Sequence, residues 1–180
     1  MISKNTFLLL AGFAFFFVTE AHALQVSVLG GLSAGKPSYS AGSAQSKTAL
    51  TYGALLGDNG MVFGFETGLL SVGKKFSSGG VEYSGRAWEI PALVRFTLLP
   101  IVSAGAGAYY QNYSDKPFIA QKSTDLGLKL NARIRLPLAP LTGFLVDLSF
   151  KRGFSDLSNG VGTSYKNQEL DLLAGLNFGF

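Results

Sequence analysis

ELDLLAGLNFGF, residues 169–180, is the stretch of sequence that decides the fold. One set of alternate positions is apolar and consists of Leu170, Leu172, Ala174, Leu176, Phe178 and Phe180. The positions between them are Glu169, Asp171, Leu173, Gly175, Asn177 and Gly179. Because successive side chains of a β-strand point to opposite faces, this alternation predicts one long strand with an apolar face and a polar face.

The same alternation recurs upstream. Asp125–Leu136 repeats it with leucines on one face and charged or small residues on the other, and the six further alternating segments are Leu24–Ser33, Thr48–Leu56, Met61–Ser71, Glu82–Leu98, Val102–Asn112 and Thr142–Arg152. Most are about ten residues long, as a tilted strand must be to cross a membrane. We therefore predict an all-β fold, an eight-stranded antiparallel up-and-down transmembrane β-barrel. Pro91 cannot donate to a sheet, so a β-bulge is expected around it.

The connections alternate in length. Four are long and polar, at Ala34–Lys47, Val72–Gly80, Tyr113–Thr124 and Gly153–Lys166, whereas Asp58–Gly60, Leu99–Ile101 and Pro137–Leu141 are short. Asn59-Gly60 is a strong hairpin signal. Outer-membrane barrels have short periplasmic turns and longer external loops, so the alternation is in phase if both termini are periplasmic.

The charges distinguish a membrane barrel from a soluble one. Within the predicted strands they gather on the polar face: Glu66, Glu89, Arg95, Asp125, Lys129, Arg133, Arg135, Asp147, Lys151, Glu169 and Asp171. Only Glu82, Arg86 and Arg152, near strand ends, share the parity of the apolar face. A Lys or Arg facing lipid at the membrane midplane costs about 2–4 kcal/mol. A lumen that encloses charges should pair them, whereas a soluble periplasmic barrel, the alternative, need not.

Counting along the hairpins predicts particular ion pairs inside the barrel. They are Lys151 with Glu169, Arg133 with Asp147, and Arg95 with Glu66 or Glu89 across the space left by Gly105 and Gly107. Glu66 and Glu89 lie on neighbouring strands and are expected to need a cation between them, unless one of them stays protonated. The predicted result is a salt-bridged polar network that fills the lumen, because an eight-stranded barrel is just wide enough for side chains to fill.

The N-terminus has the three parts of an export signal. Lys4 supplies positive charge, Phe7–Val18 is an unbroken apolar run, and Ala21-His22-Ala23 resembles a cleavage site. We predict a signal peptide over residues 1–23 and a barrel domain over residues 24–180. The chain has no cysteine, and its one histidine is His22, so the predicted mature part has neither residue.

This composition limits the chemistry. Without histidine or cysteine, residues 24–180 can build neither a Ser-His-acid arrangement nor a thiolate metal site. We expect no enzyme activity, no catalytic residue, no metal and no cofactor. Glu169 and Asp171 are a conceivable carboxylate pair, with structural ion pairing as the favoured interpretation. The basic residues form no helix or stacking platform, so nucleic acid is not an expected partner.

Three motifs carry a family resemblance. WEIPALVRF at Trp88–Phe96, SAGAGAY at Ser103–Tyr109 and LSFKRGFSDL at Leu148–Leu157 resemble strands of small bacterial outer-membrane β-barrel domain proteins, the eight-stranded kind that includes OmpX and the OmpA barrel. The C-terminal residues Leu176, Phe178 and Phe180 are similar to the signal that the barrel assembly machinery recognises. The resemblance implies architecture and an outer-membrane location, and it implies little about a task.

These observations predict a non-enzymatic integral outer-membrane protein that is structural or presents surface loops. The alternative is a narrow channel or transporter for small or apolar solutes. Expected partners are membrane lipids and the assembly machinery; a monomer is favoured, with the oligomeric state left open. Lysines gather in the predicted loops, at Lys36, Lys47, Lys74, Lys75, Lys116, Lys122 and Lys166. A lysine-rich rim would favour the anionic phosphates of lipopolysaccharide, although ordinary solvated loop charge is the favoured interpretation of these lysines.

Overall fold

A computed structural model describes residues 24–36, 38–39, 42–43, 45–58, 62–116, 122–157 and 165–179. The predicted signal peptide, the Asn59-Gly60 turn and the terminal Phe180 lie outside the described residues. The described part contains no helix, and so none that is long and apolar enough to cross a membrane.

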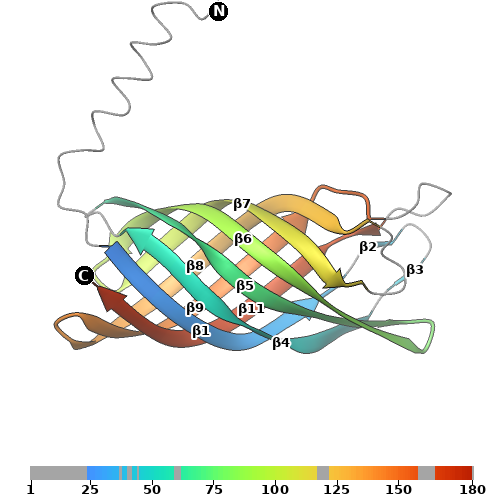
Figure 1. Ribbon diagram of the computed structural model, residues 1–180, viewed down its shortest axis with the longest axis horizontal. Coiled ribbons are helices and arrows are strands. Elements are labelled where there is room, and N and C mark those ends of the chain that lie inside the picture. Colours follow the sequence, from blue (N-terminus) through green and yellow to red (C-terminus); the bar gives the residue numbers. More distant parts are fainter. Residues whose placement is uncertain are drawn as a thin grey trace, which may run out of the picture.

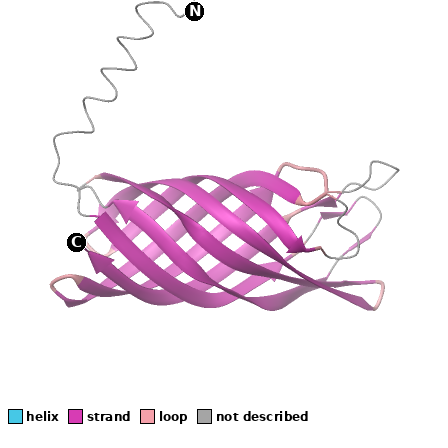
Figure 2. Cartoon of the chain, viewed as in Figure 1, coloured by secondary structure: helices cyan, strands magenta, loops and turns pink. Residues whose placement is uncertain are grey.

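Eight long strands close into one antiparallel barrel (Figures 1 and 2). They are β1 Leu24–Gly35, β4 Gln45–Asp58, β5 Phe63–Ser78, β6 Val81–Leu99, β7 Val102–Asp115, β8 Thr124–Ala139, β9 Thr142–Gly153 and β11 Gln168–Gly179. Each strand pairs with its sequence neighbour, and β1 pairs with β11 to close the cylinder. Closure leaves no free edge, which is what a sheet in lipid requires. The predicted strands and topology are confirmed.

The two ends of the barrel differ. The first residue of β1 and the last residue of β11 lie at one end, together with the short connections after β4, β6 and β8; the β5–β6 turn and the three longer connections lie at the other (Figure 1). We call these the turn end and the loop end. Three short strands, β2 Ser38–Tyr39, β3 Gly42–Ser43 and β10 Tyr165–Lys166, form a small sheet at the loop end.

The predicted loop Val72–Gly80 is wrong, because this segment continues the β5–β6 hairpin. Gly79 and Gly80 form its turn with φ of 60° and 82°, the left-handed region in which a two-residue hairpin turn places both of its residues. Next to the turn, Phe76 stacks on Tyr83 with ring centroids 5.3 Å apart. The hairpin is therefore an ordered extension of the barrel wall.

The β-bulge expected at Pro91 is absent from the β5–β6 pairing. Thr67 pairs with Ala92 and Leu70 with Glu89 at one unchanged offset, so the proline interrupts the ladder without shifting its register. A missing N–H removes one hydrogen bond, but it does not require an extra residue. Irregularities in β6 occur instead in its pairing with β7, between Arg86 and Ala87 and between Thr97 and Leu99.

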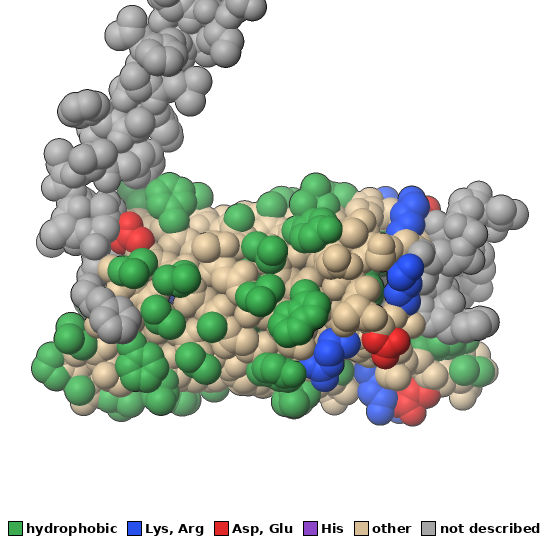
Figure 3. Space-filling model, viewed as in Figure 1, with side chains coloured by type: hydrophobic (Ala, Val, Ile, Leu, Met, Phe, Trp, Pro, Cys, Tyr) green, Lys and Arg blue, Asp and Glu red, His purple; other side chains and the backbone are tan. Residues whose placement is uncertain are grey.

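The barrel is apolar outside and polar inside. In β8, Leu126, Leu128 and Leu130 are each more than half exposed, whereas the residues between them are buried. Figure 3 shows apolar side chains spread along the wall and charged ones gathered toward the loop end. The predicted assignment of faces is confirmed, and this exterior suits a hydrocarbon environment.

Candidate functional site

The interior of the barrel holds an unusual amount of charge. Its buried charged residues, each at most 7% exposed, are Glu66, Lys74, Glu89, Arg95, Asp125, Lys129, Arg133, Asp147, Lys151, Glu169 and Asp171. Five are bases and six are acids. We call this set the lumen network. An isolated buried charge is expensive, so the stability of the barrel depends on how these groups pair.

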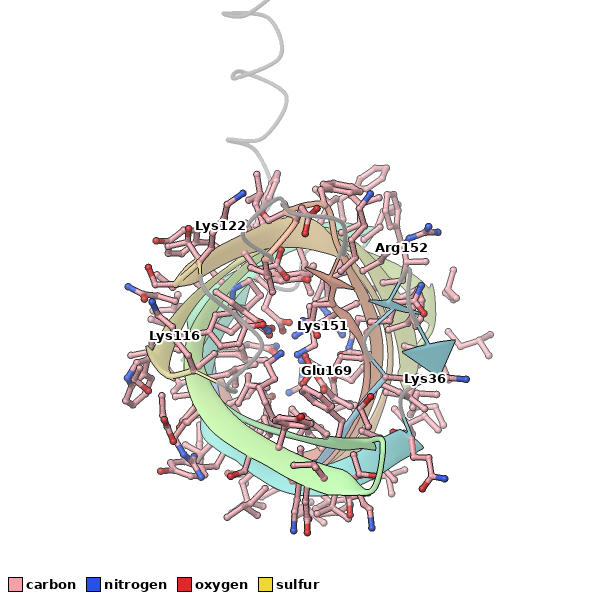
Figure 4. All side chains as sticks on the ribbon, turned by 90° about the vertical axis from the view of Figure 1, so that its right-hand side faces the viewer. Lys36, Lys116, Lys122, Lys151, Arg152 and Glu169 are labelled. Carbon is pink, nitrogen blue, oxygen red and sulfur yellow. The ribbon has the colours of Figure 1, made fainter. Side chains whose placement is uncertain are left out.

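Lys151 is the centre of the half of the network nearer the loop end. Its Nζ lies 2.7 Å from a Glu89 oxygen, 2.9 Å from Glu169 and 2.8 Å from Asp171. Figure 4 shows Lys151 and Glu169 pointing into the lumen. The pairing of Lys151 with Glu169 follows from their direct opposition in the β9–β11 register and confirms the prediction from hairpin counting.

Glu89 offsets the repulsion between two lysines that face each other. Lys129 and Lys151 are direct register partners on β8 and β9, an arrangement that is destabilising by itself. Glu89 projects from β6 and binds both ammonium groups at 2.7 Å, while Gln111 donates a third hydrogen bond to it at 2.7 Å. One buried carboxylate on β6 therefore binds one lysine on each of two strands, β8 and β9, that are not neighbours of β6.

A second cluster lies nearer the turn end and centres on Arg133. The guanidinium of Arg133 binds Glu66 across the lumen and Asp147 on the next strand, the latter at 2.7 Å and 2.8 Å. The Arg133–Asp147 pairing confirms the second predicted pair. Arg95 Nη1 lies 3.5 Å from Glu66, and both of its terminal nitrogens donate to Asn131 Oδ1 at 2.5 and 2.6 Å.

Glycine makes room for one of these side chains, as the sequence indicated. A Cβ placed on Gly105 would lie 3.3 Å from Arg95 Nη1. The expectation that Glu66 and Glu89 share a cation is wrong, however. Each carboxylate has its own pair of bases, because Arg95 and Arg133 reach Glu66 whereas Lys129 and Lys151 reach Glu89.

Two basic residues were misplaced by the sequence analysis. Arg135 is only partly buried and forms no ion pair with any described residue, because it lies beyond the last lumen carboxylate toward the turn end of β8. Lys74 was assigned to an external loop, yet it is 5% exposed and binds Glu169 at 2.5 Å. The signal that could have found Lys74 is the two-residue period of β5 counted past Ser71, because Leu70, Val72, Lys74 and Phe76 share the inward face.

Apolar residues also face inward, and the alternation in the sequence does not predict that they cluster. One cluster, on the strands β1, β4, β5, β9 and β11, consists of Leu29, Leu55, Leu70, Val72, Leu145 and Leu173. Another lies near the loop end and consists of Phe76, Ala87, Tyr113 and Leu157. Several of these residues adjoin outward-facing apolar ones, as Leu55 adjoins Leu56, so alternation is hard to see there. The lumen is thus filled by side chains of both kinds.

Asp125 differs from the other lumen carboxylates. It is 1% exposed and accepts a hydrogen bond from the Tyr109 hydroxyl at 2.9 Å, but no base of the described chain lies within ion-pair distance of it. Gly153 passes beside it, where a Cβ would contact the carboxylate. Among the described residues, no group of three or more His, Cys, Asp or Glu side chains is arranged to hold a metal ion.

The exterior charges are distributed unevenly. At the loop end, outside the lumen, lie Lys36, Lys47, Lys75, Arg86, Lys116, Lys122, Arg152 and Lys166, against Glu82, Asp115 and Asp156. Figure 4 shows Lys36, Lys116, Lys122 and Arg152 around this rim. Since the lumen network is nearly balanced and the turn end carries Asp58 and Arg135, the net positive charge of residues 24–180 lies at the loop end.

Comparison with known proteins identifies the class of fold. No family model matches the chain, and no curated protein sequence matches it. Among solved structures it is similar to Neisserial surface protein A (16% identity, TM-score 0.56, covering 87% of this chain and 97% of that one) and to Ail of Yersinia pestis with a heparin analogue (16%, 0.50, 86% and 99%). It is also similar to the outer-membrane protease OmpT of Escherichia coli (10%, 0.53, 90% and 98%).

At these identities the likeness concerns the fold. All three structures are outer-membrane β-barrels, and this chain has the same closed sheet with an apolar exterior of its own. The chain is an eight-stranded integral outer-membrane β-barrel protein. One of these neighbours is a protease, so the fold alone does not decide between enzymes and other barrels.

Proposed function

We propose that this protein is a non-enzymatic outer-membrane barrel with a closed lumen, which presents a basic loop end to the outer leaflet and the cell exterior. The lumen network is the main observation that supports this proposal. Its ion pairs join β5, β6, β8, β9 and β11 across the interior, and Lys151 at its centre has no exposed surface. A water-filled pore would expose such groups to solvent.

The absence of histidine and cysteine from residues 24–180 supports a non-enzymatic role. The carboxylates Glu169 and Asp171 are both held by Lys151, as structural ion pairs are. Neither is placed like a general base that could reach a substrate, since each is at most 2% exposed.

The basic loop end supports lipopolysaccharide as the partner. The phosphates of lipopolysaccharide lie in the outer leaflet, beside the barrel wall at the loop end in the proposed orientation. An excess of lysine and arginine at this end attracts them. The structure of Ail contains a sulfated heparin analogue, which makes a soluble polyanion the natural competitor in a binding test.

Conductance in planar lipid bilayers tests the closed lumen. We expect no steady open state for the wild-type protein, nor for Lys166→Ala, which changes an exposed rim residue. Lys151→Ala should introduce open events, because it removes the centre of the network and leaves space. A steady open state of the wild type would contradict the proposal and favour the narrow channel for small solutes.

A further inference from the structure

Arg86 is a half-buried basic residue on the outer wall, in the part of β6 nearer the loop end. Tyr52 on β4 and Trp88 on β6 are each 46% exposed and lie on either side of Ser71 in one row across β4, β5 and β6. Tyrosine and tryptophan gather at membrane interfaces, where their rings lie at headgroup level. Arg86 lies two residues from Trp88 toward the loop end, and we infer from these aromatic residues that it is within reach of the headgroups.

The wall is built to hold the Arg86 side chain in one place. Its register partner on β5 is Gly73, where a Cβ would lie 2.6 Å from the carbonyl oxygen of Leu50. The guanidinium of Arg86 lies 5.5 Å from the centre of the Tyr52 ring, and Nη1 donates to Ser71 Oγ at 2.8 Å. A guanidinium has five N–H donors, so most remain available to a ligand that approaches from the membrane.

The described carboxylates on the outer face near Arg86 form no ion pair with it. Lys75 binds Glu82 at 2.6 Å and lowers the pKa of that carboxyl group, and Lys47 is near enough to lower it further. Asp115 is the register partner of Arg86 on β7 and lies beside it, but no ion pair within 4 Å joins them. Arg86 is therefore not neutralised by a carboxylate of the described chain.

From this geometry we propose that Arg86, supported by Tyr52 and Ser71, binds a phosphate group of lipopolysaccharide in the outer leaflet. The planar guanidinium of arginine can donate two parallel hydrogen bonds to the oxygens of a phosphate group. Stacking on an aromatic ring keeps the guanidinium in one orientation. This inference rests on the proposed contact with lipopolysaccharide and assigns it a specific site.

The chain offers its own reporter and its own control. Trp88 is the only tryptophan, so its fluorescence reports on this part of the wall. Arg152 is an exposed arginine of the outer face just beyond an aromatic residue, Phe150, but no described side chain holds its guanidinium. It tests the effect of charge without the supporting contacts.

The experiment titrates bisphosphorylated lipid A into the folded full-length protein in detergent micelles and follows Trp88 emission. We expect saturable binding that is absent with lipid A lacking phosphates and with inorganic phosphate. Arg86→Gln should weaken binding about tenfold, as loss of a charge-assisted contact does. Arg152→Gln should change it by less than about twofold, as surface charges do. Arg86→Lys should fall between wild type and Arg86→Gln.

Asp115→Asn provides a readout that a merely structural role of Arg86 would not change. Removing a negative charge beside the phosphate should tighten binding. Heat-modifiable gel mobility confirms that each variant is folded. Equal weakening by Arg86→Gln and Arg152→Gln would overturn the site while leaving a diffuse contact with lipopolysaccharide. Equal binding of lipid A without phosphates, or Arg86-dependent binding of sucrose octasulfate at the affinity of lipid A, would also overturn it. None of these outcomes depends on conductance, which tests the closed lumen separately.

Discussion

Lys151→Met should destabilise the barrel more than any other single neutralisation of a lysine. The side chain has no exposed surface and contacts three carboxylates between 2.7 and 2.9 Å away. After its loss, Lys129 still binds Glu89 and Lys74 still binds Glu169, whereas Asp171 keeps only the hydrogen bond from Ser33. Removing one partner of a buried pair costs about 3–5 kcal/mol, because an unpaired charge remains.

Urea unfolding in lipid vesicles measures this cost. With a slope of about 2 kcal/mol per molar urea, the midpoint should fall by about 2 M. The control is Lys166→Met, which removes an exposed lysine and should leave the midpoint nearly unchanged. The double variant Lys151→Met with Asp171→Asn should recover part of the loss, since it removes the unpaired carboxylate. An unchanged midpoint for Lys151→Met, or a double variant no more stable than the single one, would refute the reasoning.

Three further predictions concern the wall, the loop end and assembly. Gly175→Ala should block folding, because a Cβ there would overlap the Val28 carbonyl, whereas Gly30→Ala, with 3.9 Å to the nearest atom, should fold normally by gel mobility. Since Lys75 lowers the pKa of Glu82, carbon-detected NMR should find Glu82 titrating below the ordinary 4.5, and Lys75→Met should raise its pKa toward that value. The Lys75–Glu82 pair therefore stabilises the protein at pH values above the ordinary pKa of Glu82, and this contribution is lost as the pH falls through the lowered pKa. An unchanged titration midpoint of Glu82 in the Lys75→Met variant would contradict this. Deletion of the C-terminal phenylalanine should reduce outer-membrane assembly more than secretion, and normal assembly would count against the predicted signal.

Much of the lumen could be predicted from local sequence. Alternation assigns each strand residue to a face, and every predicted member of the network except Arg135 is buried inside. Pairs within one hairpin were also predictable, as with Lys151 and Glu169, because the turn defines which residues lie opposite each other. The continuation of β5 through Lys74 was missed because a polar stretch that ends in two glycines resembles a loop.

The sequence by itself determined that the chain forms a closed, membrane-type barrel and which side of each strand faces the lumen, since both depend on the two-residue period of a strand. Only the tertiary structure decided which charges meet across the lumen: Lys74 with Glu169, Arg133 with Glu66, and Glu89 with Lys129 and Lys151. Such contacts join strands that are not neighbours, and they depend on how tilt and shear bring opposite walls together when the sheet closes. The contacts of Arg86 with Tyr52 and Ser71 have the same origin, because they depend on the β4–β5–β6 register.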